Sequence, residues 1–247
     1  MQDGLAQACS ALDVAPPVLW SVLSVETSGC GFLADRRPRI LFERHKFSRH
    51  TGGRYDASHP AISNPAPGGY QSPSADQYVR LQEALALDRD AALQSASWGI
   101  GQIMGENFAA ANCRSAEEMV GRMCAGEAEQ LACMAAFILA AGLGAALRKR
   151  DWAGFAAGYN GPRFRENAYD TKLAAFYAQY AAGPLPDLRA RAAQMFLMFR
   201  GYDVGPIDGV LGGRSVAALR KFQSDSGMAA SGRLDDETWS KLSAAAG

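Results

Sequence analysis

The sequence has few of the residues that fix a fold through covalent crosslinks or metal ions. Its 247 residues include only 3 histidines and 5 cysteines. The cysteines (Cys9, Cys30, Cys113, Cys124 and Cys133) are odd in number, and no two of them form a CxxC pair. This pattern argues against a disulfide framework or a structural zinc site, and it indicates synthesis in a reducing compartment.

The chain also has no excess of charge and no long apolar run. Its 25 basic side chains balance 25 acidic ones, so bulk electrostatics gives no reason to expect a nucleic-acid partner. The longest apolar stretch, residues 131–147, is rich in alanine and glycine and short for a membrane span, so we expect a buried helix and no membrane insertion. The N-terminus lacks a basic segment followed by an apolar core, which predicts a soluble protein without a signal peptide.

Helical periodicity extends over most of the chain and predicts a mainly α-helical fold. Between residues 35 and 74 the sequence turns basic and rich in glycine and proline, with one β-like run, "RILF", so we expect a hairpin or irregular lobe there. The segment "AAGPLPD" ends the last helix of this part and forms a short, stiff linker. The sequence therefore predicts two domains, residues 1–182 and 187–247. The predicted helices cover residues 4–12, 17–27, 75–90, 115–124, 126–147, 152–157 and 165–180, then 188–200, 214–225 and 235–245.

Glu26 stands where an apolar helix, "PPVLWSVLS", gives way to glycines. The carbonyl end of a helix disfavours an ionised carboxylate, and neighbours such as Val22 and Val25, with Phe32 closing over the side chain from the loop, would bury it. Both effects raise the pKa, and a protonated carboxyl group near neutral pH can donate a proton to a glycosidic oxygen. Taken alone, this segment favours a solvated residue at the end of a helix.

Two further segments carry polar groups that suit a polysaccharide. In "SASWGIGQIMG", glycines mark a close approach to the backbone, while Ser97 and Gln102 lie among apolar neighbours; the alternative is a tight helix start with a buried tryptophan. In "GYNGP", Tyr159 and Asn160 lie on a stiff loop and can position an acid or a substrate amide; the alternative is a turn capped by asparagine.

Together, these segments resemble the lysozyme superfamily, including goose-type lysozymes and soluble lytic transglycosylases. Residues 10–180 are similar to the N-acetylmuramidase domain of modular phage endolysins through "VETSGCGF", "RPRILFERHKF", "SNPAPGGY", "LDRDAALQSASWGIGQIMG" and "GYNGPRFRENAYDTKLAAFY". The resemblance implies a lysozyme-like α-helical catalytic domain with a small β lobe, a cleft between them, and Glu26 as the catalytic acid. The C-terminal segment, "FRGYDVGPIDGVLGGRSVAALRKFQSDSGMAASGRLDDETWSKL", resembles a three-helix peptidoglycan-binding domain.

The resemblance leaves the second catalytic group open. Glu43 in "ILFERH" lies on the expected β lobe, with Asp35 and Asp56 as rivals, and an ion pair with Arg39, Arg44 or Lys46 is its alternative role. Lytic transglycosylases use one glutamate, because the N-acetyl oxygen of the substrate assists departure. Hydrolysis and transglycosylation therefore both stay open.

The sequence also contains features of two other classes of protein. The segment "SRHTGGRYD" has a His and an Asp near the spacing of zinc-dependent peptidoglycan carboxypeptidases, but no histidine follows His59 to complete the ligand set. A non-catalytic wall-binding protein is disfavoured because Glu26, Gln102 and Tyr159 are all present.

We therefore expect a peptidoglycan hydrolase that cleaves the β-1,4 bond between N-acetylmuramic acid and N-acetylglucosamine, without a metal or organic cofactor. Glu26 donates the proton, Ser97, Gln102 and Tyr159 orient the acid or the sugar, and Asn160 shapes the same wall. Glu43 is the expected activator of water. The partner is the bacterial glycan strand and the enzyme is expected to be a monomer. As an endolysin it would wait in the host cytoplasm until the membrane is permeabilised, and then act on the periplasmic cell wall.

Overall fold

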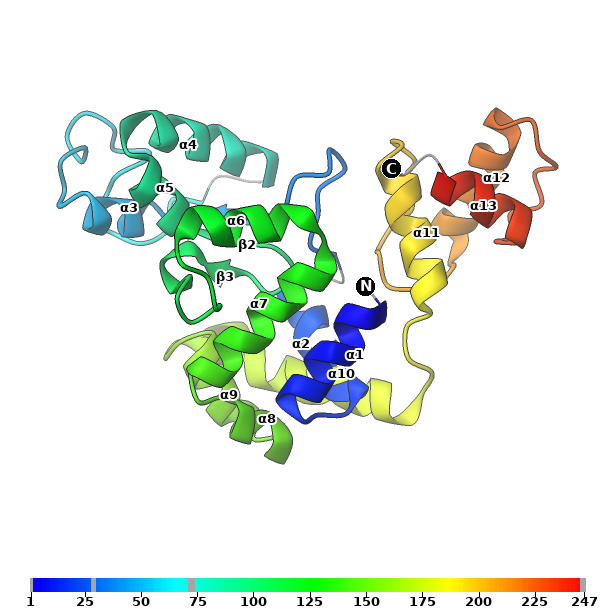
Figure 1. Cartoon of the computed structure of the whole chain (residues 1–247), viewed down its shortest axis with the longest axis horizontal. Helices are drawn as coiled ribbons and strands as arrows, with labels where there is room; N and C mark the ends of the chain where they lie inside the picture. Colours follow the sequence, from blue (N-terminus) through cyan, green and yellow to red (C-terminus); the bar gives the residue numbers. More distant parts are fainter. Residues whose placement is uncertain (1, 28–29, 71–73, 245–247) are drawn as a thin grey trace.

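A computed structural model describes residues 2–27, 30–70 and 74–244, and its elements are labelled in Figure 1. Thirteen α-helices, two short 3-10 helices and one three-stranded sheet make up this described part, which confirms the predicted mainly α-helical class. In chain order the elements are α1 (Gln2–Leu12), α2 (Pro16–Thr27), β1 (Ile40–Phe42), α3 (Arg44–His50), α4 (Ser74–Leu87), α5 (Arg89–Gln94), β2 (Ala96–Trp98), β3 (Ile103–Met104), η1 (Gly105–Asn107), α6 (Ala116–Ala125), α7 (Glu127–Ala140), α8 (Gly144–Lys149), α9 (Trp152–Tyr159), η2 (Phe164–Asn167), α10 (Tyr169–Ala182), α11 (Leu188–Met198), α12 (Gly213–Asp225) and α13 (Asp236–Ala244).

The sheet is antiparallel, with strand order β1-β2-β3. Ile40 pairs with Trp98, and Ser97 pairs with Met104. The hairpin is thus formed by β2 and β3, and the segment predicted to hold it, residues 35–74, contributes β1 and the unpredicted helix α3. The run "RILF" was correctly predicted to be a strand. Its pairing with β2 could not be predicted, because a strand of three residues has too short a pattern to specify its partner.

The predicted helix over residues 126–147 is two helices in the structure, α7 and α8. Gly142 adopts a left-handed backbone with φ of 71°, and the N–H of Leu143 donates to the carbonyl of Ile138 at 2.9 Å. Glycine is the residue that most easily takes this conformation after a helix, so the break follows from a local stop signal inside an otherwise helical pattern.

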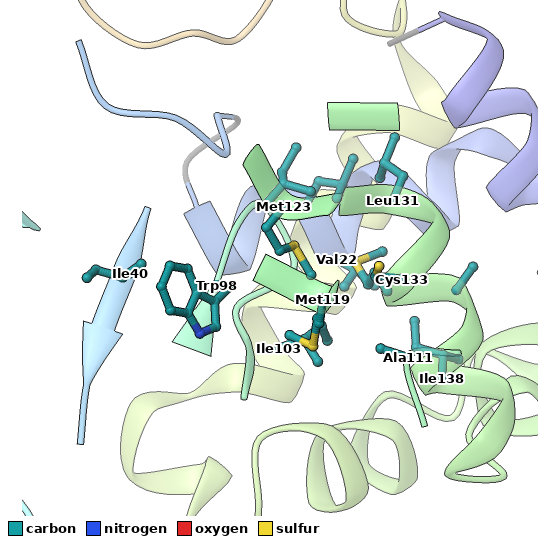
Figure 2. Packing of buried hydrophobic residues seen from close by; sticks show 14 of the residues in the cluster. Val22, Ile40, Trp98, Ile103, Ala111, Met119, Met123, Leu131, Cys133 and Ile138 are labelled. Atoms are coloured by element: carbon teal, nitrogen blue, oxygen red, sulfur yellow. The ribbon is translucent and has the colours of Figure 1, made fainter. Parts of the chain in front are cut away.

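The main core forms around α2, which packs against α10, while α1 packs against α7. Leu19, Val22 and Leu23 of α2 are fully buried in it. Figure 2 shows part of this cluster, with Val22 drawn together with Met119, Met123 and Cys133 of α6 and α7. The core thereby holds the end of α2, where Glu26 lies, in a fixed position.

Helices α11–α13 form the second part of the chain, set apart in Figure 1 and joined to α10 by residues 183–187. Its apolar cluster includes Leu197, Leu219 and Phe222, and it also takes in Cys30 and Phe32 from the first part. Phe32 meets Phe199 edge-on, at 6.4 Å between ring centroids. The prediction that Phe32 closes over Glu26 is therefore wrong, because the apolar surface of α11 competes for that ring.

A buried ion pair also joins the two parts. Arg191 of α11 donates to both carboxylate oxygens of Glu127 at the start of α7, at 2.6 and 2.7 Å, and the side chains are 1% and 3% exposed. The same carboxylate accepts from the backbone N–H of Gly31 at 3.1 Å. The second part is thus docked on the first through charge and apolar contact as well as through the linker.

No single helix among the described residues is long and apolar enough to cross a membrane; only the pair Asp3–Leu12 and Pro16–Thr27, bent by 108°, meets the length and composition test together.

Candidate active site

A cleft of about 440 Å³ opens at the C-terminal end of α2. Its walls come from α2, from the three-stranded sheet and from the region of α9 and α10. All six residues singled out in the sequence line it: Glu26, Glu43, Ser97, Gln102, Tyr159 and Asn160. Six others also line it: Val25, Leu41, Met104, Asn167, Tyr169 and Lys172. Segments as distant in sequence as residues 26 and 172 therefore contribute to one concave surface.

Glu26 is half-buried on the floor of this cleft, and the hydroxyl of Tyr169 donates a hydrogen bond to its Oε1. Burial raises the pKa of Glu26 to about 7, and the hydrogen bond from Tyr169 opposes part of that rise because it favours the ionised form. Burial, followed by the charge of Glu26, raises the pKa of Tyr169, so this hydroxyl keeps its proton and stays a donor. Glu26 is thus a carboxyl group that holds a proton close to neutral pH.

The β2–β3 hairpin fixes the two polar side chains that it carries. The Ser97 hydroxyl donates to Oε1 of Gln102 at 2.8 Å, and Nε2 of Gln102 donates to the carbonyl of Gly99 at 2.9 Å. Gln102 has a left-handed backbone with φ of 47°, which is uncommon outside glycine and places its side chain back over the turn. The two side chains are therefore held in one orientation at the cleft wall.

Glycines in this hairpin make room for protein side chains. A Cβ on Gly99 would lie 2.8 Å from Cδ of Gln130, and one on Gly101 would lie 2.7 Å from Cγ of Met134. Gln130 in turn accepts from the N–H of Ile100 at 2.8 Å. The close approach expected at these glycines is thus made by α7, which braces the hairpin from behind.

Tyr159, the last residue of α9, contacts the same hairpin. Its hydroxyl donates to the carbonyl of Gly101 at 2.6 Å, and its ring stacks on Phe155 at 5.0 Å between centroids. Burial and the nearby charge of Glu26 raise the pKa of Tyr159. Asn160 follows as the exposed C-terminal cap of α9. Tyr159 thus holds the wall beside Glu26, and Asn160 offers an amide at its edge.

Glu43 lies between β1 and α3 and faces the same cleft. Both of its carboxylate oxygens accept from the hydroxyl of Tyr70 at 2.8 Å, and Nδ1 of His45 lies 3.1 Å from Oε2. Two of the basic side chains weighed as its partners bond elsewhere, Arg39 to the carbonyl of Cys30 and Lys46 to Glu106.

The two rival carboxylates do not line the cleft. Asp35 is paired with Arg37 in an exposed loop, and Asp56 accepts from the hydroxyls of Ser48 and Ser63. Glu43 is therefore the second carboxylate that shares a cavity with Glu26.

The His and Asp considered as zinc ligands face different partners. Nε2 of His50 lies 2.9 Å from Oε2 of Glu106, whereas Asp56 binds two serine hydroxyls. Across residues 2–27, 30–70 and 74–244, no three His, Cys, Asp or Glu side chains are grouped so as to hold a metal ion.

Models of protein families match both parts of the chain. Residues 15–181 match the model described as N-acetylmuramidase. The chain belongs to the N-acetylmuramidase family. Residues 188–242 match the model of a peptidoglycan binding domain, and together the two matches make this protein a peptidoglycan hydrolase, a glycosidase of the muramidase type. The predicted resemblance is thereby confirmed.

Among solved structures, the muramidase is similar to the Burkholderia AP3 phage endolysin, at 39% sequence identity and a TM-score of 0.67. The match covers 72% of this chain and 69% of the endolysin chain. A search of curated proteins finds no match.

Sequence reasoning missed two side chains that contact the carboxylates of this muramidase. Tyr169 follows Glu26 by 143 positions, and Tyr70 follows Glu43 by 27. Both tyrosines lie in segments that carry the family resemblance, but nothing in their local sequence indicates which carboxylate each contacts. Chain folding alone decides these pairings.

Proposed function

We propose that the muramidase cleaves the β-1,4 bond between N-acetylmuramic acid and N-acetylglucosamine, with Glu26 as the general acid. The observation that carries this proposal is the half-buried Glu26 carboxyl, whose pKa burial raises to about 7 at the floor of a cleft. A group with that pKa holds a proton near neutral pH and can still release it to the departing glycosidic oxygen.

The β2–β3 hairpin and the C-terminal end of α9 support this assignment, because their polar side chains are held by hydrogen bonds. Ser97 donates to Gln102, and Gln102 and Tyr159 each donate to a carbonyl of the hairpin, so hydrogen bonds hold all three side chains in place. We assign them to holding the sugar ring and the acid in register, and Asn160 to the edge of the same subsite.

Glu43 is our candidate for the second carboxylate, activating water on the opposite face of the sugar as in an inverting hydrolase. Its placement in the same cleft favours this role. The alternative is a lytic transglycosylase, in which the N-acetyl oxygen of the substrate replaces Glu43. Mass spectrometry of the products separates the two, because hydrolysis leaves reducing muramic ends and transglycosylation leaves anhydromuramic ends.

Replacement of Glu26 by glutamine tests the acid directly. The amide has nearly the same shape but cannot donate a proton to the leaving oxygen, and general acid catalysis contributes about 10²–10⁴-fold. We expect Glu26→Gln to lose that factor in turnover on purified sacculi while its circular dichroism spectrum stays that of the wild type. Turnover within a few-fold of wild type would reject Glu26 as the acid.

We also propose that the protein is made in the host cytoplasm and reaches the periplasmic wall when the membrane is permeabilised. Its five cysteines are unpaired, and Cys124 is exposed, which suits a reducing compartment. Fractionation of host cells before and after membrane permeabilisation tests this proposal, since recovery in the periplasm beforehand would contradict it.

A further inference from the structure

A second cavity adjoins the cleft on the far side of Tyr70. It has a volume of about 410 Å³, and its lining includes Arg44, Gly69, Tyr70, Arg80 and Glu83. Tyr70 links the two spaces, because its hydroxyl donates to Glu43 in the cleft while its side chain lines the cavity.

Two guanidinium groups in this cavity have buried N–H groups without an acceptor. Arg80 is 8% exposed; its Nη2 donates to the carbonyl of Ala61 at 2.8 Å, but its Nη1 has no partner in the described part of the chain. The Nε of Arg44 is likewise buried and unpartnered there. A buried donor without an acceptor is costly, and the cost is higher when the group is charged.

The same two groups also have no direct ion pair with a carboxylate of the described residues. Neither Arg44 nor Arg80 lies within ion-pair distance of a carboxylate among the described residues, although the exposed Glu83 lines the cavity and Glu43 lies next to it. Burial, followed by the positive charge of Arg44, lowers the pKa of Arg80, and the charges of Glu43 and Glu83 oppose only part of that fall. The two cations in this cavity therefore repel each other. A bound anion would accept from the unpartnered N–H groups and relieve this repulsion.

The backbone leaves room for this arrangement. Gly69 has φ of 70°, and a Cβ at this position would lie 2.6 Å from Cζ of Arg44. The loop therefore places glycine where the guanidinium of Arg44 packs, and the ring of Phe42 supports the guanidinium of Arg80 at 5.5 Å.

We propose that Arg44 and Arg80 bind a carboxylate of the peptide stem that muramic acid carries. This inference rests on the proposed function, because it places a muramic acid residue in the cleft beside Glu43. The stem is joined to the lactyl group of that sugar by an amide, so its carboxylates extend several bonds away from the ring, and a planar guanidinium matches a carboxylate geometrically. The cavity would make the enzyme selective for glycan that still carries its peptides.

The test compares soluble glycan fragments that carry intact stems with the same fragments after their stem carboxylates have been converted to amides. The readout is the ratio of kcat/KM on the two substrates, measured with the full-length protein. Removing a hydrogen bond between charged groups typically lowers affinity about tenfold or more, so Arg44→Gln should lower this ratio by about tenfold. Arg80→Lys, which keeps the charge but loses the planar fork, should lower it less.

A matched control is Arg114→Gln, which removes an exposed arginine paired with Glu118 far from this cavity in the chain. It should keep the wild-type ratio. An unchanged ratio in folded Arg44→Gln and Arg80→Lys would overturn the inference, as would an equal fall in Arg114→Gln, which would show an effect of net charge alone.

Binding measurements separate this inference from the proposed chemistry. The Glu26→Gln protein should bind fragments with free stem carboxylates more tightly than fragments with amidated ones, and adding Arg44→Gln should abolish that preference. If the wild type releases no sugar ends but this preference is seen, the chemistry fails and the carboxylate site stands. If cleavage occurs and Glu26→Gln shows no preference, the site fails alone.

Discussion

The buried pair between Arg191 and Glu127 offers the sharpest test of how the two domains cooperate. Replacing Arg191 with methionine keeps much of the aliphatic packing and leaves the Glu127 carboxylate, 3% exposed, with the N–H of Gly31 as its one remaining donor among the described residues. Breaking a buried, doubly hydrogen-bonded pair costs about 3–5 kcal/mol, because the surviving charge stays out of water without compensation. We therefore expect Arg191→Met to destabilise the protein by about that amount.

A double-mutant cycle isolates the interaction from the loss of packing. Glu127→Gln removes the charge but keeps an acceptor for Gly31, so the variant carrying Glu127→Gln together with Arg191→Met leaves no unpaired charge of this pair in the interface. It should be more stable than Arg191→Met alone by about 1–3 kcal/mol, the usual desolvation penalty of an unsatisfied polar group. Urea unfolding followed by tryptophan fluorescence and by circular dichroism gives the four free energies of unfolding.

The exposed pair Arg114–Glu118 provides the control, since its arginine is 92% exposed and its removal should leave the urea midpoint unchanged. The reasoning is refuted if Arg191→Met unfolds at the wild-type midpoint and residues 183–187 are no more sensitive to protease than in the wild type. That result would mean that water already screens the pair and that the interface holds without it.

Three further predictions concern the cleft and the domain arrangement. The value of kcat/KM should fall as the pH rises through about 7, where Glu26 loses its proton. Tyr169→Phe should move that fall to higher pH, because it removes the hydrogen bond that lowers the pKa of Glu26. A pH profile that does not move would contradict the pairing of Tyr169 with Glu26. Glu43→Gln should lower turnover without lowering the melting temperature if the carboxylate activates water, whereas a lower melting temperature with turnover preserved would assign it to anchoring Tyr70. A protein that ends at Gly183 should be less stable and slower even on soluble oligosaccharides, because truncation exposes the surface that α11 covers; equal rates on soluble substrate would reduce the C-terminal domain to an anchor.

Features that depend on neighbours along the chain could be predicted without a structure. Apolar spacing gave α2, and the turn to glycines after it placed Glu26 at the helix end. Segments that carry the family resemblance located the six residues that the fold gathers into one cleft. The prediction was wrong at Gly142, which lies inside the single helix predicted over residues 126–147. Glycine is a stop signal there, but the apolar periodicity continues on both sides of it and favoured one long helix.

Tertiary structure decided the contacts between residues far apart in the chain. Tyr169 contacts Glu26, Arg191 contacts Glu127, and Phe32 contacts Phe199 because the fold brings distant segments of the chain together. Such contacts depend on how the whole chain folds. The sequence around a side chain is the same whether or not a distant partner lies beside it. The pKa of Glu26 is a further example. Its position at a helix end can be predicted from the sequence. The burial that raises its pKa arises only when α2, α10 and the sheet pack around the cleft.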